Sequence, residues 1–69
     1  MITQIGLTAG DIWNYLDTHN RTDKFEAIVK AIGKEREIVL MSMGWLAREG
    51  HIIVEREGAD YTVRLTKKG

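Results

Sequence analysis

The stretch Val39–Ile52, VLMSMGWLAREGHI, decides the predicted fold. Its first ten residues are mostly apolar and favour a helix, and Gly50 is the residue expected just past a helix end. The segment after Gly50, His51-Ile52-Ile53-Val54-Glu55-Arg56, is rich in β-branched residues and predicts a strand. We therefore expect a helix that begins within residues 34–37, ends at Glu49 and runs into a strand. That helix is apolar almost all the way round, so it either reads a ligand such as DNA or is itself buried against a partner.

Two more helices are expected upstream. The first begins after Thr8, because Thr8 and Asp11 resemble a capping box, and Asn20 is its expected stop. One face of this helix carries Ala9, Ile12, Leu16 and His19, with Trp13 and Tyr15 beside it.

The second helix has the clearer pattern. Asp23 and Glu26 form a capping pair, with Thr22 as the competing cap. Its apolar stripe falls at the i, i+3, i+4 and i+7 positions, and Gly33 follows it; the stripe is Phe25, Ile28, Val29 and Ile32. Only three or four residues then separate the second helix from the third, which is helix-turn-helix spacing.

A β-hairpin is expected at the C-terminal end. Residues 51–56 form its first strand, residues 57–60 its turn, and residues 61–65 a second strand that alternates apolar and polar side chains. A short third strand is expected at residues 2–5, and residues 66–69 are expected to be a frayed polar tail. Three helices followed by a hairpin predict one α+β domain over residues 1–69, a winged helix-turn-helix with the hairpin as wing.

Several short runs resemble a small prokaryotic family of free-standing winged helix-turn-helix domains without an assigned function. The specific run is Gly44-Trp45-Leu46-Ala47-Arg48-Glu49, supported by Ile5-Gly6, Ala9-Gly10, Ile12-Trp13 and Tyr15-Leu16. The resemblance spans residues 5–65. It implies a winged-helix fold, a nucleic-acid role by analogy and homodimers, although a fold by itself does not establish a function.

The balance of charges limits the kinds of binding partner that we expect. Ten Lys and Arg residues match ten Asp and Glu residues, whereas a dedicated nucleic-acid binder is usually visibly basic. Double-stranded DNA would therefore be held by a local patch. The candidate residues lie at the ends of the third helix and around the wing: Lys34, Arg36, Arg48, Arg56, Arg64 and Lys67. Such residues usually contact phosphate, but interleaved Glu and Asp also fit an ordinary solvated surface.

The third helix is expected to bury Val39, Ser42, Met43 and Leu46 and to expose the opposite face. In the middle of that outer face lie Leu40, Met41, Gly44 and Trp45, which cannot read a pattern of base donors and acceptors. Either residues 1–5 or the tail cover these four residues, or a partner does. We take them as candidate partner-interface residues, with a homodimer as the partner form, because Trp and Met are enriched at interface cores.

Nothing in the sequence predicts catalysis, a cofactor or a metal. His19 and His51 lie far apart, Ser42 falls on a face expected to be core, and there is no cysteine and no glycine-rich phosphate loop. No small-molecule substrate is evident. No segment approaches the ~20 apolar residues of a membrane span, and no signal peptide is recognisable. We expect a non-enzymatic cytoplasmic protein that regulates transcription by binding DNA, or alternatively a homodimerising interaction module.

Overall fold

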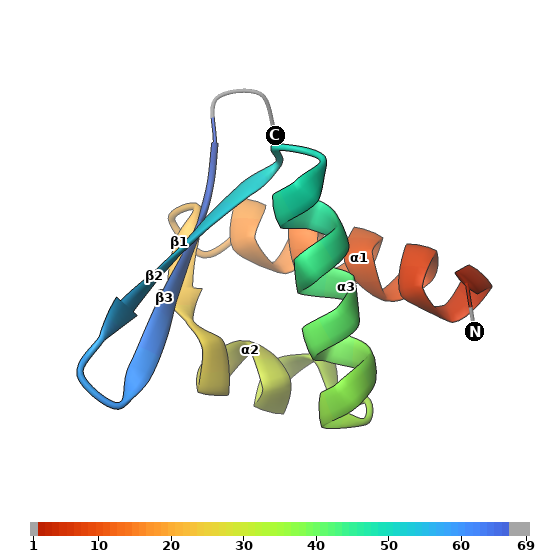
Figure 1. Ribbon diagram of the computed structural model, residues 1–69, viewed down its shortest axis with the longest axis horizontal. Coiled ribbons are helices and arrows are strands. Elements are labelled where there is room, and N and C mark those ends of the chain that lie inside the picture. Colours follow the sequence, from red (N-terminus) through yellow and green to blue (C-terminus); the bar gives the residue numbers. More distant parts are fainter. Residues whose placement is uncertain (1, 67–69) are drawn as a thin grey trace.

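The computed structural model describes residues 2–66 and has the architecture of a winged helix. Three helices lie to one side of a small sheet (Figure 1). The helices are α1 (Ile2–Asp17), α2 (Phe25–Ile32) and α3 (Arg36–Arg48), and the strands are β1 (Thr22–Lys24), β2 (Ile52–Glu57) and β3 (Asp60–Leu65). The predicted α+β class, the order of the helices and the hairpin wing are confirmed.

The sheet is antiparallel with the strand order β1-β3-β2. In the hairpin, Ile52 pairs with Leu65 and Glu57 with Asp60, which leaves Gly58 and Ala59 as a two-residue turn. Gly58 has a φ of +63°, a conformation that glycine adopts without the steric cost of a Cβ. The turn therefore lies within the predicted residues 57–60.

One apolar core joins the sheet to all three helices. It contains Ile12 and Leu16 of α1, Ile28 of α2, Val39 of α3 and Val63 of β3, each fully buried. Ser42 is buried beside them and donates a hydrogen bond from its Oγ to the carbonyl oxygen of Ile38 at 2.7 Å. The predicted buried face of the third helix, Val39, Ser42, Met43 and Leu46, is confirmed.

The N-terminal predictions were wrong. Residues 2–5 do not form a strand, because α1 already begins at Ile2. Thr8 is not a helix cap but lies within α1, where it is fully buried and its Oγ1 accepts a hydrogen bond from Nζ of Lys34 at 3.3 Å. The helix ends at Asp17, and Asn20 and Arg21, both with positive φ, turn the chain toward the sheet.

The start of the second helix also differs from its prediction. Thr22 and Asp23 do not cap α2 but belong to β1, whose Asp23 pairs with Val63 of β3. The N-cap of α2 is Lys24, and it makes no side-chain capping bond. The C-terminal end of α2 is as predicted: Gly33 has a φ of +71°, and its N–H donates to the carbonyl oxygen of Val29.

Thr66, predicted to be part of a frayed tail, is held in place. Its N–H donates to the carbonyl oxygen of His51 at 3.0 Å, and its Oγ1 donates to that of Gly50 at 2.6 Å. Its own carbonyl accepts a hydrogen bond from Arg21 at 2.7 Å. Residues 67–69 of the predicted tail lie outside the described residues.

Candidate functional site

The outer face of α3 is exposed, as its helical periodicity predicts. Leu40 is 58% exposed, Trp45 47% and Met41 41%, and Gly44 is also at the surface. A Cβ built on Gly44 would meet no atom within 4 Å. The outer face therefore combines large apolar side chains with a bare stretch of helix backbone, features typical of a surface that a partner covers.

Leu40 and Trp45 lie on opposite flanks of α3. Arg36, one turn before Leu40, packs over the ring of Phe25 on α2 at 5.0 Å, so the Leu40 flank is directed toward α2. Trp45 instead lines a hollow of about 320 Å³ with Ile2, Ile5 and Gly6 of α1. The four candidate interface residues are thus spread across the whole outer face.

The first turns of α1 cover Trp45 only in part. Ile2 and Ile5 lie beside it, yet almost half of Trp45 is exposed, and Ile2 itself is 85% exposed. Of residues 1–5, which were expected to cover the apolar face, Ile2 and Ile5 cover part of one flank, and Met1 lies outside the described residues. Neither Leu40 nor Met41 lines this hollow, and both are exposed.

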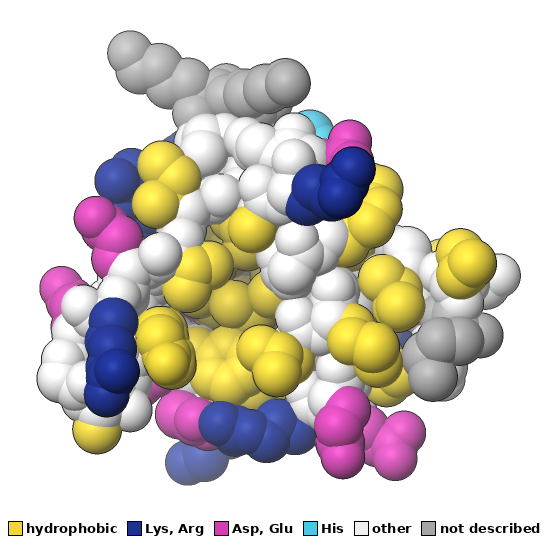
Figure 2. Space-filling model, viewed as in Figure 1, with side chains coloured by type: hydrophobic (Ala, Val, Ile, Leu, Met, Phe, Trp, Pro, Cys, Tyr) yellow, Lys and Arg dark blue, Asp and Glu magenta, His cyan; other side chains and the backbone are white. Residues whose placement is uncertain are grey.

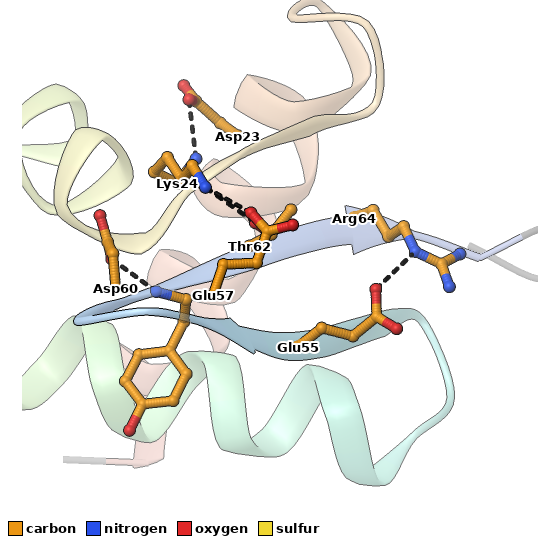
Figure 3. A network of polar contacts seen from close by, with 8 residues as sticks. Asp23, Lys24, Glu55, Glu57, Asp60, Thr62 and Arg64 are labelled. Atoms are coloured by element: carbon orange, nitrogen blue, oxygen red, sulfur yellow. Dashed lines mark hydrogen bonds and ion pairs between the residues drawn. The ribbon is translucent and has the colours of Figure 1, made fainter.

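Three of the predicted DNA-binding cations are paired with carboxylates. Lys34 lies 3.5 Å from Asp11, and Arg64 lies 3.5 Å from Glu55 (Figure 3). The guanidinium of Arg36 donates two hydrogen bonds, of 2.8 and 2.6 Å, to the carboxylate of Glu26. These hydrogen bonds lower the pKa of Glu26 and raise that of Arg36. A phosphate would have to compete with these carboxylates.

Arg48 and Arg56 have no carboxylate partner among the described residues. Arg48 ends α3, and its side chain forms no hydrogen bond or ion pair with a described residue, while Arg56 donates from Nε to the carbonyl oxygen of Gly58 at 3.2 Å. Figure 2 shows basic side chains over the hairpin and at the C-terminal end of α3, on either side of an apolar surface between wing and helices. Lys67 lies outside the described residues.

The two faces of the wing differ. Ile52, Val63 and Leu65 point into the core, and by the alternation of a strand Arg56 shares their face. The opposite face carries a polar network in which Nζ of Lys24 bonds Glu57 at 2.5 Å and Thr62 at 3.2 Å (Figure 3). The hydrogen bond from Lys24 lowers the pKa of Glu57. Arg64 belongs to this network face and not to the face of Arg56.

A second hollow was not predicted from the sequence. It measures about 400 Å³ and lies between α1 and α3, and its walls are Gly6, Ala9, Gly10, Trp13, Trp45, Leu46 and His51. Gly6 and Gly10 are four residues apart, which puts both on one face of a helix. This spacing indicates a gap in the helix surface only if both glycines lie within α1. Sequence reasoning placed Gly6 before the helix.

The described residues offer neither a metal site nor a membrane-spanning helix. No group of three or more His, Cys, Asp or Glu residues within residues 2–66 is placed to hold a metal ion. None of the helices in that range is both long and apolar enough to cross a membrane.

Comparison with known proteins identifies relatives of unknown role. Residues 1–65 match the family described as "Winged helix-turn-helix domain (DUF2582)". An uncharacterized protein of Methanocaldococcus jannaschii, MJ1608, is 35% identical over 63 residues, which cover 90% of both chains. No solved structure matches the chain significantly.

Proposed function

The chain belongs to the winged helix-turn-helix family DUF2582, and from this premise we propose that it binds double-stranded DNA as a non-enzymatic regulator of transcription. The proposed binding is mainly to the phosphate backbone, because the outer face of α3 offers apolar Leu40 and Met41 where base reading needs polar groups. A cytoplasmic location, where prokaryotic DNA lies, is part of the same proposal.

The observation that carries this proposal is the pair Arg48 and Arg56. Neither has a carboxylate partner among the described residues, so each can pair with phosphate without first breaking an ion pair. Arg48 lies at the end of α3 and Arg56 lies in the wing. Winged helices usually approach a duplex with these two elements. Two cations without a carboxylate partner among the described residues support weak binding, in the range of non-specific protein–DNA contacts.

Titration of duplexes of unrelated sequence at low and moderate salt tests the proposal. With two phosphate contacts, the logarithm of the binding constant should fall with the logarithm of salt concentration at a slope of about −2. Arg48→Ala and Arg56→Ala should each reduce the steepness of this slope by about 1. Arg64→Ala is the matched control, since Arg64 lies on the opposite face of the same hairpin and pairs with Glu55. Absence of binding at low salt would contradict the proposal.

A second candidate function is self-association through the outer face of α3. The observation that favours it is the exposure of Leu40, Met41 and Trp45 on one helix. Apolar and aromatic side chains form the cores of protein interfaces, and Gly44 leaves room there for close approach of another backbone. A symmetric dimer is the commonest oligomer and would bury this face in both copies.

Sedimentation equilibrium tests self-association. The wild-type chain should associate as its concentration rises, whereas Trp45→Arg should remain monomeric because it puts a charge into the interface. Leu7→Arg is the matched control: Leu7 is 63% exposed on α1 but lines neither hollow, so this variant should associate like the wild type. A wild-type chain that stays monomeric at high concentration rules this candidate out.

A further inference from the structure

The hollow of about 400 Å³ between α1 and α3 has the size of a small-molecule site. Buried Ala9 and Leu46 contribute to its lining, together with two large aromatic side chains, Trp13 and Trp45. Among residues 2–66, no Lys, Arg, Asp or Glu lines it. A ligand that entered it would therefore meet mostly apolar surface, with His51 as the titratable group.

Part of the hollow is lined by helix backbone without side chains, at Gly6 and Gly10. Gly6 and Gly10 are one turn apart in the interior of α1, where a glycine costs about 0.5–1 kcal/mol relative to alanine. A Cβ added to either would meet nothing within 4 Å, so close packing within the described chain does not require them. Their effect is to leave space beside the two tryptophans, which side chains at these positions would fill.

His51 supplies an unused hydrogen-bonding group. Its backbone is fixed, since its N–H donates to the carbonyl oxygen of Leu46 at 2.9 Å and its own carbonyl accepts from Thr66 at 3.0 Å. Its ring lines the hollow, but its Nδ1 atom is buried and has no hydrogen-bond partner among the described residues. Buried polar atoms nearly always have a partner, and a bound molecule is one way to provide it.

We propose that this hollow binds a small, uncharged aromatic molecule with one hydrogen-bonding group. The aromatic ring would lie against Trp13, Trp45 and the bare turn of α1, and a small rotation of the imidazole would bring Nδ1 of His51 to the polar group. The ligand is uncharged because no charged side chain among the described residues lines the hollow to pair with it. This site goes beyond the proposed function, since it requires neither DNA nor a second copy of the chain.

Indole and indene are matched probes, because they share a shape and only indole has an N–H. In two-dimensional NMR titrations of the full chain, indole should shift the signals of Gly6, Gly10, His51 and the two Trp side chains in a saturable manner. A hydrogen bond to Nδ1 should make indole bind about threefold to tenfold more tightly than indene. His51→Phe should remove this difference while both probes still bind.

Gly10→Leu should fill the hollow and abolish binding of both probes while the chain remains folded, because the added Cβ meets open space. Gln4→Leu adds the same side chain to an exposed position of α1 outside the hollow and should bind like the wild type. The proposal fails if neither probe gives saturable shifts, or if Gly10→Leu binds them unchanged. It also fails if probe affinity falls as protein concentration rises, since a second copy then occupies the hollow. Because DNA is absent, failure here leaves the proposed DNA binding untouched.

Discussion

At the scale of single residues, replacing Gly10 and Gly33 by alanine should change the free energy of unfolding in opposite directions. Gly10 lies inside α1 with open space around its Cβ position, so Gly10→Ala should raise the free energy of unfolding by about 0.5–1 kcal/mol. Gly33 ends α2 at a φ of +71°, where any Cβ is strained, and Gly33→Ala should lower that free energy by about 1–2 kcal/mol. Urea unfolding at low protein concentration measures both. Equal signs for the two variants would contradict the assignment.

The capping residues show where local sequence signals fail. Thr8 and Asp11 have the spacing of a capping box, yet α1 begins about two turns earlier, at Ile2. Thr8 is fully buried instead. A cap is a local preference of about 1 kcal/mol, and the burial of Thr8 in the folded chain overrides it. The glycines after α2 and α3 were predicted correctly, because a left-handed residue has few alternatives to glycine.

At the scale of single elements, one ion pair joins α2 to α3 and should make the fold acid-sensitive. Hydrogen bonds from Arg36 hold the pKa of Glu26 below its ordinary value of 4.5. A carboxylate whose pKa is lower when folded stabilises the fold above its unfolded pKa, and this contribution is lost as the pH falls through the lowered pKa. The urea midpoint should thus drop between about pH 5 and pH 3.

Glu26→Gln separates this ion pair from general acid effects. The variant should be less stable than the wild type at neutral pH and should lose less stability on acidification. Glu35→Gln is the control, because Glu35 forms no ion pair among the described residues and its variant should keep the acid response of the wild type. An unchanged acid response in Glu26→Gln would contradict the assigned role of the Arg36 pair.

Elements differ in how far the sequence determines them. The hairpin and α2 carry strong periodic patterns and were predicted nearly to the residue. The strand β1 was missed because it has three polar residues and exists only through its pairing with β3, as in Thr22 with Arg64. A contact between segments some 40 residues apart leaves no local pattern.

For the whole molecule, the fold follows from the order of the elements, but the pairing of surface charges does not. Lys34 and Asp11, or Arg64 and Glu55, become neighbours only in the folded chain. Of the six basic residues that the sequence put forward as DNA-binding candidates, Lys34, Arg36 and Arg64 are paired with carboxylates. Arg48 and Arg56 have no carboxylate partner among the described residues, and Lys67 lies outside them. The outer face of α3 was predictable because helical periodicity alone determines it.

The two candidate functions should respond oppositely to salt. Contacts of Arg48 and Arg56 with phosphate are electrostatic and should weaken about tenfold or more between about 50 and 200 mM salt. Self-association through Leu40, Met41 and Trp45 is apolar, so it should persist or strengthen over the same range. Sedimentation with and without a fluorescent duplex, at both salt concentrations, measures the two equilibria on one sample. If self-association also falls with salt, the interface is charged and the apolar face of α3 is not its core. If DNA binding is insensitive to salt, the proposal that Arg48 and Arg56 contact phosphate is wrong.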